Sequence, residues 1–240
     1  MKDEFKSSSI ALFSALLTPS TLLSGAAYGT MFALKVNPLT DTPIIILERR
    51  LFIVLSGLTT ACALTAVISS AMALFRLRFM SNASISLASL PSVPSSYGLK
   101  DFLRDNVRPF FLSSFVNFTA AMAGFVSMVA VRAWHVLSCP DLALGLALFL
   151  AGFAVNILSL IERALWGMDG GGYNCDSWND WRFPDKLLGL VKEYAHFLMG
   201  RMRFKNGAPG QAPFRVVSCG LWVGGSIALG KSFAKAIAAI

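Results

Sequence analysis

A long apolar run without any charged residue occupies residues 51–75, and it constrains the fold more than any other feature of the sequence. The run is rich in Leu, Ala, Val and Ile, and it ends sharply at Arg76 and Arg78. A helix of about 20 predominantly apolar residues is long enough to cross the hydrocarbon core of a bilayer. We therefore expect an integral membrane protein.

Three further apolar runs reach the same length, at residues 9–34, 110–131 and 142–161. Pro19 interrupts the first, and the last two are separated only by residues 132–141, so they are expected to form a tight antiparallel hairpin. Pro140 and Asp141 are typical of a helix start. The predicted fold is all-α, a polytopic bundle of four transmembrane helices within residues 1–165.

The composition favours the bilayer as the main partner. Hydrophobic residues make up 55% of the chain and charged residues 14%, whereas soluble domains carry about 25% charged residues. The net charge is +8, but the basic residues cluster between and after the apolar runs. This distribution is typical of membrane topology and does not indicate a nucleic-acid partner.

The basic residues also predict the orientation. Of the 21 Lys and Arg residues, 17 fall in the N-terminus, the second loop and the region after residue 161. Positively charged loops stay on the cytoplasmic side. Both termini are therefore expected there, or on the matrix or stromal side of an organelle.

The remaining chain, residues 166–240, is predicted to be a tail on that same side. Residues 184–203 form a basic amphipathic helix, with Leu190, Val191 and Tyr194 on its apolar face. Such a helix lies on an anionic membrane surface or docks on a partner, and we favour the surface. Residues 216–240 are predicted to form a helix that is interfacial or packed on the bundle, because their uncharged part stops at Lys231, too early for a span.

Residues that would carry enzymatic chemistry are scarce, so we expect no enzyme, no cofactor and no metal site. The two histidines, His135 and His196, lie far apart, and no nucleophile elbow, P-loop or zinc motif is present. The four cysteines have no metal-ligand spacing. Asn117 and Asn156 are the mid-helix polar residues, and interhelical hydrogen bonds are their expected role.

The first apolar run carries a face of mostly small residues at helical spacing: Leu22, Gly25, Ala26, Gly29 and Ala33. Small residues let neighbouring helices approach closely, so one interpretation is tight packing inside the bundle. The other interpretation is a helix lining a narrow pore, where small side chains leave room for ions and water.

Residues 20–33, Ser-Thr-Leu-Leu-Ser-Gly-Ala-Ala-Tyr-Gly-Thr-Met-Phe-Ala, resemble the first, pore-lining helix of the Orai calcium-channel family. Residues 152–156, Gly-Phe-Ala-Val-Asn, are similar to part of the family's fourth helix. The layout of four helices, a long internal second loop and a C-terminal helical extension is also similar. The resemblance implies a homo-oligomeric channel in which Leu22, Gly25, Ala26, Gly29 and Ala33 face the pore.

Two positions depart from that family. The acidic residue of the family's selectivity filter falls on Ala33, and its internal basic ring falls on Thr18. The resemblance therefore does not carry calcium selectivity. Two hypotheses follow for the function: an Orai-like homo-oligomeric ion channel lined by the first helix, or a non-catalytic structural or accessory subunit of a larger membrane complex.

Overall fold

The computed structural model describes residues 2–33, 42–79, 99–136, 140–166, 183–202 and 212–238. In every segment except the second, the description covers only some of the side chains. Within these ranges the chain is helical and has no strand, as predicted. The six helices are α1 (Lys2–Met31), α2 (Pro43–Phe79), α3 (Leu99–Val136), α4 (Pro140–Trp166), α5 (Phe183–Met202) and α6 (Ala212–Ile237). The middle of the second loop and the Gly- and aromatic-rich loop after α4 lie outside the described residues.

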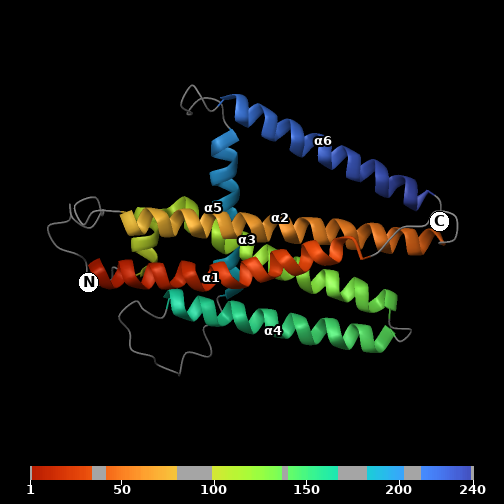
Figure 1. Ribbon diagram of the computed structural model, residues 1–240, viewed down its shortest axis with the longest axis horizontal. Helices are drawn as coiled ribbons and strands as arrows, with labels where there is room; N and C mark the ends of the chain where they lie inside the picture. The colour runs from red at the N-terminus through yellow and green to blue at the C-terminus, as the bar shows by residue number, and fades with distance from the viewer. Residues whose placement is uncertain are drawn as a thin grey trace.

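Helices α1 to α4 run side by side along the long axis of the molecule (Figure 1). α5 crosses this bundle, and α6 lies apart from it at an angle. Among the described residues, three helices are long and apolar enough to cross a membrane: Glu4–Met31, Pro43–Phe79 and Asn106–Val136. The described apolar part of α4, Asp141–Ile157, is shorter. The integral membrane fold is thus supported by three helices, and the fourth crossing stays a prediction.

The pairing of α2 with α3 is the most extensive in the bundle. The buried residues of α2 alternate in steps of four and three, and this period of about 3.5 is typical of left-handed helix packing. They are Phe52, Ser56, Thr59, Ala63, Ala66, Ser70, Ala73 and Leu77, and Ser69 and Leu74 are buried next to them. Most are small, so the two backbones approach each other closely.

Polar contacts fix the register of this antiparallel pair. Ser69 Oγ donates to Ser113 Oγ at 2.7 Å, and Ser70 Oγ donates to Ser114 Oγ at 3.1 Å. Nearer the other end, Gly124 lies so close to Thr59 that an added Cβ would come within 2.4 Å of the Thr59 hydroxyl oxygen. A larger residue at this position would require the Thr59 side chain to rotate or the two helices to move apart.

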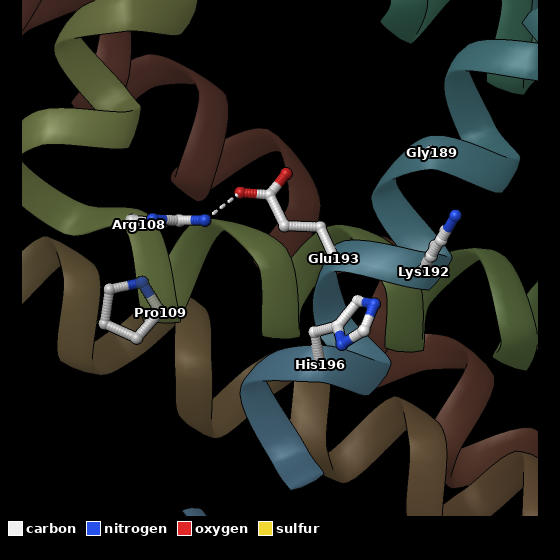
Figure 2. Close-up of a pocket in the computed structure, with 6 residues that line it drawn as sticks. All are labelled: Arg108, Pro109, Gly189, Lys192, Glu193 and His196. Atoms are coloured by element: carbon white, nitrogen blue, oxygen red, sulfur yellow. Dashed lines mark hydrogen bonds and ion pairs between the residues drawn. The ribbon is translucent and has the colours of Figure 1, made fainter. Parts of the chain in front are cut away.

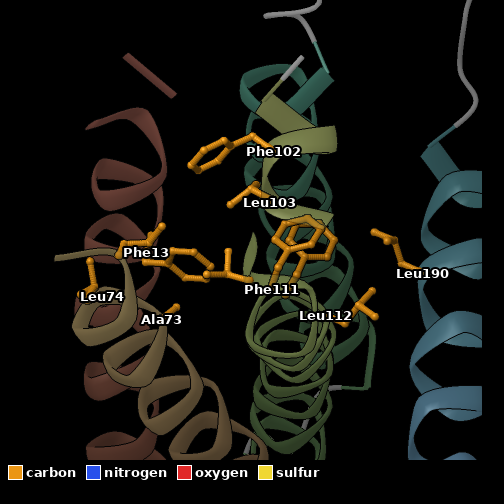
Figure 3. Packing of buried hydrophobic residues seen from close by; sticks show 11 residues of the cluster. Phe13, Ala73, Leu74, Phe102, Leu103, Phe111, Leu112 and Leu190 are labelled. Carbon is orange, nitrogen blue, oxygen red and sulfur yellow. The ribbon is translucent and has the colours of Figure 1, made fainter. Parts of the chain in front are cut away.

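α1 runs parallel to α3 and packs against both α2 and α3. The rings of Phe5 and Phe102 lie 6.0 Å apart at one end, and the Thr30 hydroxyl lies 3.6 Å from the Met128 sulfur at the other. Between them, Phe13 enters a buried cluster with residues of α2 and α3 (Figure 3). α3 is interrupted at Val107 (φ −135°, ψ 22°), just before Pro109, whose ring and missing N–H prevent a continuous helix.

α5 packs on the bundle. Leu190 is buried in the same cluster as Phe111 and Leu112 of α3. The Asn117 side-chain amide donates to the Tyr194 hydroxyl at 2.9 Å, which confirms an interhelical hydrogen bond for Asn117. Contacts with α3 thus hold this helix, and its position on the membrane surface stays a prediction. Asn156, in contrast, is exposed on α4.

α6 reaches the far end of the bundle. The Arg50 guanidinium, near the start of α2, donates to the Ser232 carbonyl oxygen, near the end of α6. The ends of α1 and α6 that carry the chain termini accordingly lie at opposite ends of the bundle (Figure 1). The side of the membrane on which each terminus lies, and an interfacial position of residues 216–240, stay predictions.

Gly124→Ala is expected to lower the free energy of unfolding by about 1–3 kcal/mol, since overpacking of a buried seam costs that much. Gly57→Ala, on α2, is the matched control, because nothing lies within 4 Å of its added Cβ. The control should be neutral or stabilising by up to about 1 kcal/mol. Thermal or denaturant unfolding in detergent measures both. Equal effects of the two substitutions would contradict the close contact, whereas Thr59→Ala should partly rescue Gly124→Ala.

Reporters fused to the two chain ends test the predicted placement of both termini on one side of the membrane against a fifth crossing by α6. In the positive-inside count, moving Lys231 and Lys235 across leaves 15 of the 21 basic residues on the N-terminal side, so both arrangements obey the rule. Protease protection of an N-terminal and a C-terminal tag in sealed vesicles measures this. We expect both tags to be protected, or neither, and protection of one tag alone would contradict the prediction.

Candidate functional site

The five residues predicted to line a pore all lie exposed on α1. Leu22 is 69% exposed, and Gly25, Ala26, Gly29 and Ala33 are exposed as well. Nothing lies within 4 Å of a Cβ added at Gly25 or Gly29. Packing inside a single bundle, the first interpretation of this face, is therefore wrong within one copy of the chain.

The opposite face of α1 makes the contacts with α2 and α3. Its buried residues again recur in steps of three and four: Ser9, Phe13, Leu16, Ser20, Ser24 and Ala27. The Ser9 and Ser20 hydroxyls donate to the carbonyl oxygens four residues earlier, at 2.7 Å each, so these hydroxyls are satisfied inside the seam. α1 thus has one face committed to the bundle and one face left open.

The open face, here called the outward face of α1, consists mainly of small and hydroxyl-bearing residues. Its small members are Ser7, Ala11, Ser14, Ala15, Thr18, Thr21, Gly25, Ala26, Gly29 and Ala33, all exposed. Only Leu22, Tyr28 and Phe32 are large, and the last two lie near the end of the helix. Most of this surface therefore provides few side-chain atoms for contact with lipid tails.

The exposed surfaces of α2 and α4 are of a different kind. α2 exposes Leu58, Leu64, Ile68, Met72 and Phe75, and α4 exposes Leu144, Leu148, Phe149, Phe153 and Ile157. Large apolar side chains of this kind are what a bilayer solvates well. The contrast indicates that the outward face of α1 is suited to another helix or to water rather than to lipid.

The outward face is also uncharged. No Asp, Glu, Lys or Arg occurs between Lys6 and Ala33. Thr21 Oγ1 donates to the Leu17 carbonyl oxygen at 2.9 Å. Its oxygen keeps acceptor capacity for water. The chemistry available along this face is weak coordination by hydroxyl oxygens.

A polar contact between His135 and Glu48 is among those that sequence reasoning missed. At the end of the bundle opposite the N-terminus, His135 Nδ1 of α3 lies 3.2 Å from Glu48 Oε2 of α2, and both side chains are partly buried. The two residues are 87 positions apart in sequence, so no local pattern connects them. Among the described residues no group of three or more His, Cys, Asp or Glu side chains is placed to hold a metal ion.

Comparisons with known protein families, with curated proteins and with solved structures find no match to this chain. The resemblance to the Orai family therefore stays a hypothesis, carried by residues 20–33, residues 152–156 and the helix layout.

Gly29→Leu is expected to leave the stability of the single-copy fold unchanged within about 0.5 kcal/mol, because its side chain would enter open space. Ala27→Leu, two residues away on the buried face, should lower the free energy of unfolding by about 1–3 kcal/mol. Unfolding of the detergent-solubilised single copy compares the two. A loss of stability from Gly29→Leu as large as that from Ala27→Leu would show that the outward face packs within the bundle.

Proposed function

We propose that the protein is the subunit of a homo-oligomeric membrane channel, in which the outward faces of several α1 helices surround a pore. The observation that carries the proposal is the contrast between helix surfaces. The outward face of α1 is small and hydroxyl-bearing, whereas the exposed surfaces of α2 and α4 carry large apolar side chains. A chain with both kinds of surface is suited to an assembly with lipid outside and α1 inside.

The geometry of α1 fits this role in one copy. α2 and α3 hold α1 along its buried face, so the helix is rigidly supported while its other face is open. Serine and threonine hydroxyls along that face would replace part of the hydration shell of an ion, and Gly25 and Gly29 would leave room for water.

The proposed pore carries no fixed charge along α1. Ring-shaped arrangements of carboxylates or of basic residues select ions by charge, and α1 has neither between Lys6 and Ala33. We accordingly propose a channel that discriminates ions weakly by charge, and calcium selectivity is not part of the proposal.

The alternative is a non-catalytic accessory subunit, in which the outward face packs on a helix of a different protein. Gly25 and Gly29 favour this alternative, since their open surroundings would allow the backbone of a partner helix to approach closely. The two functions differ in one property, which is whether water reaches the outward face in the assembled state.

Cysteine accessibility separates them. In a background without the four native cysteines, single cysteines at Ser14, Thr18, Thr21 and Gly25 are expected to react with a hydrophilic thiol reagent. Because the reactive thiolate forms in water and not in lipid, their rates should exceed those of buried positions such as Ser20 and Ala27 on the order of tenfold. Cysteines at Leu64 and Ile68 on the exposed surface of α2 are the control for lipid exposure.

The oligomeric state of the intact protein completes the test. Mass photometry of the detergent-solubilised protein should give a ring of several copies. Outward positions that react no faster than Leu64→Cys, in a complex that holds one copy of this chain, would rule out the channel and leave the accessory subunit.

A further inference from the structure

A pocket of about 640 Å³ lies between α3 and α5, and the analysis of α1 does not account for it. It is open to the outside and is lined by Arg108, Pro109, Gly189, Lys192, Glu193 and His196 (Figure 2). Gly189 and Pro109 contribute no polar side chain, and nothing lies within 4 Å of a Cβ added at Gly189. The chemistry of the pocket is therefore set by four ionisable residues.

Those residues favour an anion. Arg108 and Lys192 are cationic, Glu193 is anionic, and His196 adds a further hydrogen-bond donor. Arg108 Nη2 forms an ion pair with Glu193 Oε1, which spans the gap between the two helices. A guanidinium has five N–H donors, so this pair leaves donors on Arg108 for a second acceptor. Lys192 and His196 are exposed on the same stretch of α5.

The pocket lies where the apolar part of the bundle ends. Arg76 comes six residues after Ser70 on α2, and Arg108 comes six residues before Ser114 on α3. Because the two helices are antiparallel, Arg76 and Arg108 lie at the same level of the bundle. Arg76 terminates the uncharged run of α2. Arg108 therefore lies at the boundary between the hydrocarbon-sized segment and the polar region, where lipid headgroups are found.

α5 divides into three sectors around its axis. Leu190 and Tyr194 contact the bundle, while Gly189, Lys192, Glu193 and His196 line the pocket. The third sector, adjacent to the pocket, carries the exposed apolar side chains Leu188, Val191 and Met199. A basic pocket beside an exposed apolar strip matches a molecule with an anionic head and a hydrocarbon tail.

We propose that this pocket binds the headgroup of an anionic phospholipid. The phosphate oxygens accept hydrogen bonds from Arg108 and Lys192, and the acyl chains lie along Leu188 and Val191. Basic pockets next to transmembrane helices recognise headgroups in this way. The apolar strip distinguishes a lipid from a soluble phosphate, which would have no use for it. The proposal does not rest on the channel function.

The test uses the full-length protein, exchanged into mixed micelles that hold phosphatidylcholine and phosphatidylglycerol in equal amounts. Native mass spectrometry then counts the lipids that stay bound. The pocket variant is Arg108→Gln with Lys192→Gln. The matched control is Arg76→Gln with Arg78→Gln, which removes the same charge from exposed positions on α2 at the same level of the bundle.

We expect the wild type and the control to retain phosphatidylglycerol in preference to phosphatidylcholine. The pocket variant should lose this retention by about tenfold or more, because each basic residue near the anionic surface contributes roughly a factor of five. Glu193→Gln should retain at least as much phosphatidylglycerol as the wild type, since it removes the one repulsive charge. Lys192→Gln alone provides the same comparison if the double variant unfolds on heating more readily than the control.

Three results would overturn the proposal. Equal losses in the pocket variant and the control would reduce the preference to general surface charge. Equal retention of the two lipids by the wild type would remove the preference itself. Displacement of phosphatidylglycerol by millimolar inorganic phosphate, at constant ionic strength set with chloride, would assign the pocket to a soluble phosphate instead of a lipid.

Discussion

The close approach of α2 to α3 is the contact on which the remaining helices depend. Lipid tails are as apolar as the side chains they surround, so burial of apolar surface does not drive helices together inside a bilayer. What holds them is dispersion between closely packed atoms together with hydrogen bonds between the helices. The serine pairs at residues 69–70 and 113–114 and the contact of Gly124 with Thr59 supply both. α1 then packs along both helices, and α4 and α5 pack on α3.

This seam explains why the other surfaces of the bundle differ from one another. Once the small residues of α2 are used for packing against its neighbours, the large ones, such as Leu64 and Ile68, face outward. α1 distributes its residues differently, because its buried face holds the large side chains Phe13 and Leu16 while Gly25 lies outside. α1 thus carries small residues on both faces, and those on its outward face leave room for the close approach of a further helix.

The sequence alone predicted the helical segments, but it did not predict which face of each helix is buried. The apolar runs, the hairpin start at Pro140 and the helix near Leu190 follow from local composition and periodicity, and the structure contains helices at each of these places. Which face of α1 is buried does not follow in the same way. Serine, threonine and glycine occur on both faces, so composition cannot decide between Ser20, which is buried, and Thr18, which is exposed. That choice is made by neighbours far away in the sequence.

The contacts of α5 and α6 likewise could not be predicted from the basic residues or from the length of the apolar runs. Counting basic residues and measuring apolar length treats each segment as if it were alone in the bilayer. Tyr194 extends to Asn117, 77 residues away, and Arg50 reaches Ser232, 182 residues away. Each contact satisfies a polar group that would be costly to leave unpaired near the hydrocarbon. Buried Leu190 and the ion pair between Arg108 and Glu193 add to the contacts that hold α5. The positions of both helices therefore depend on the helices that pack first.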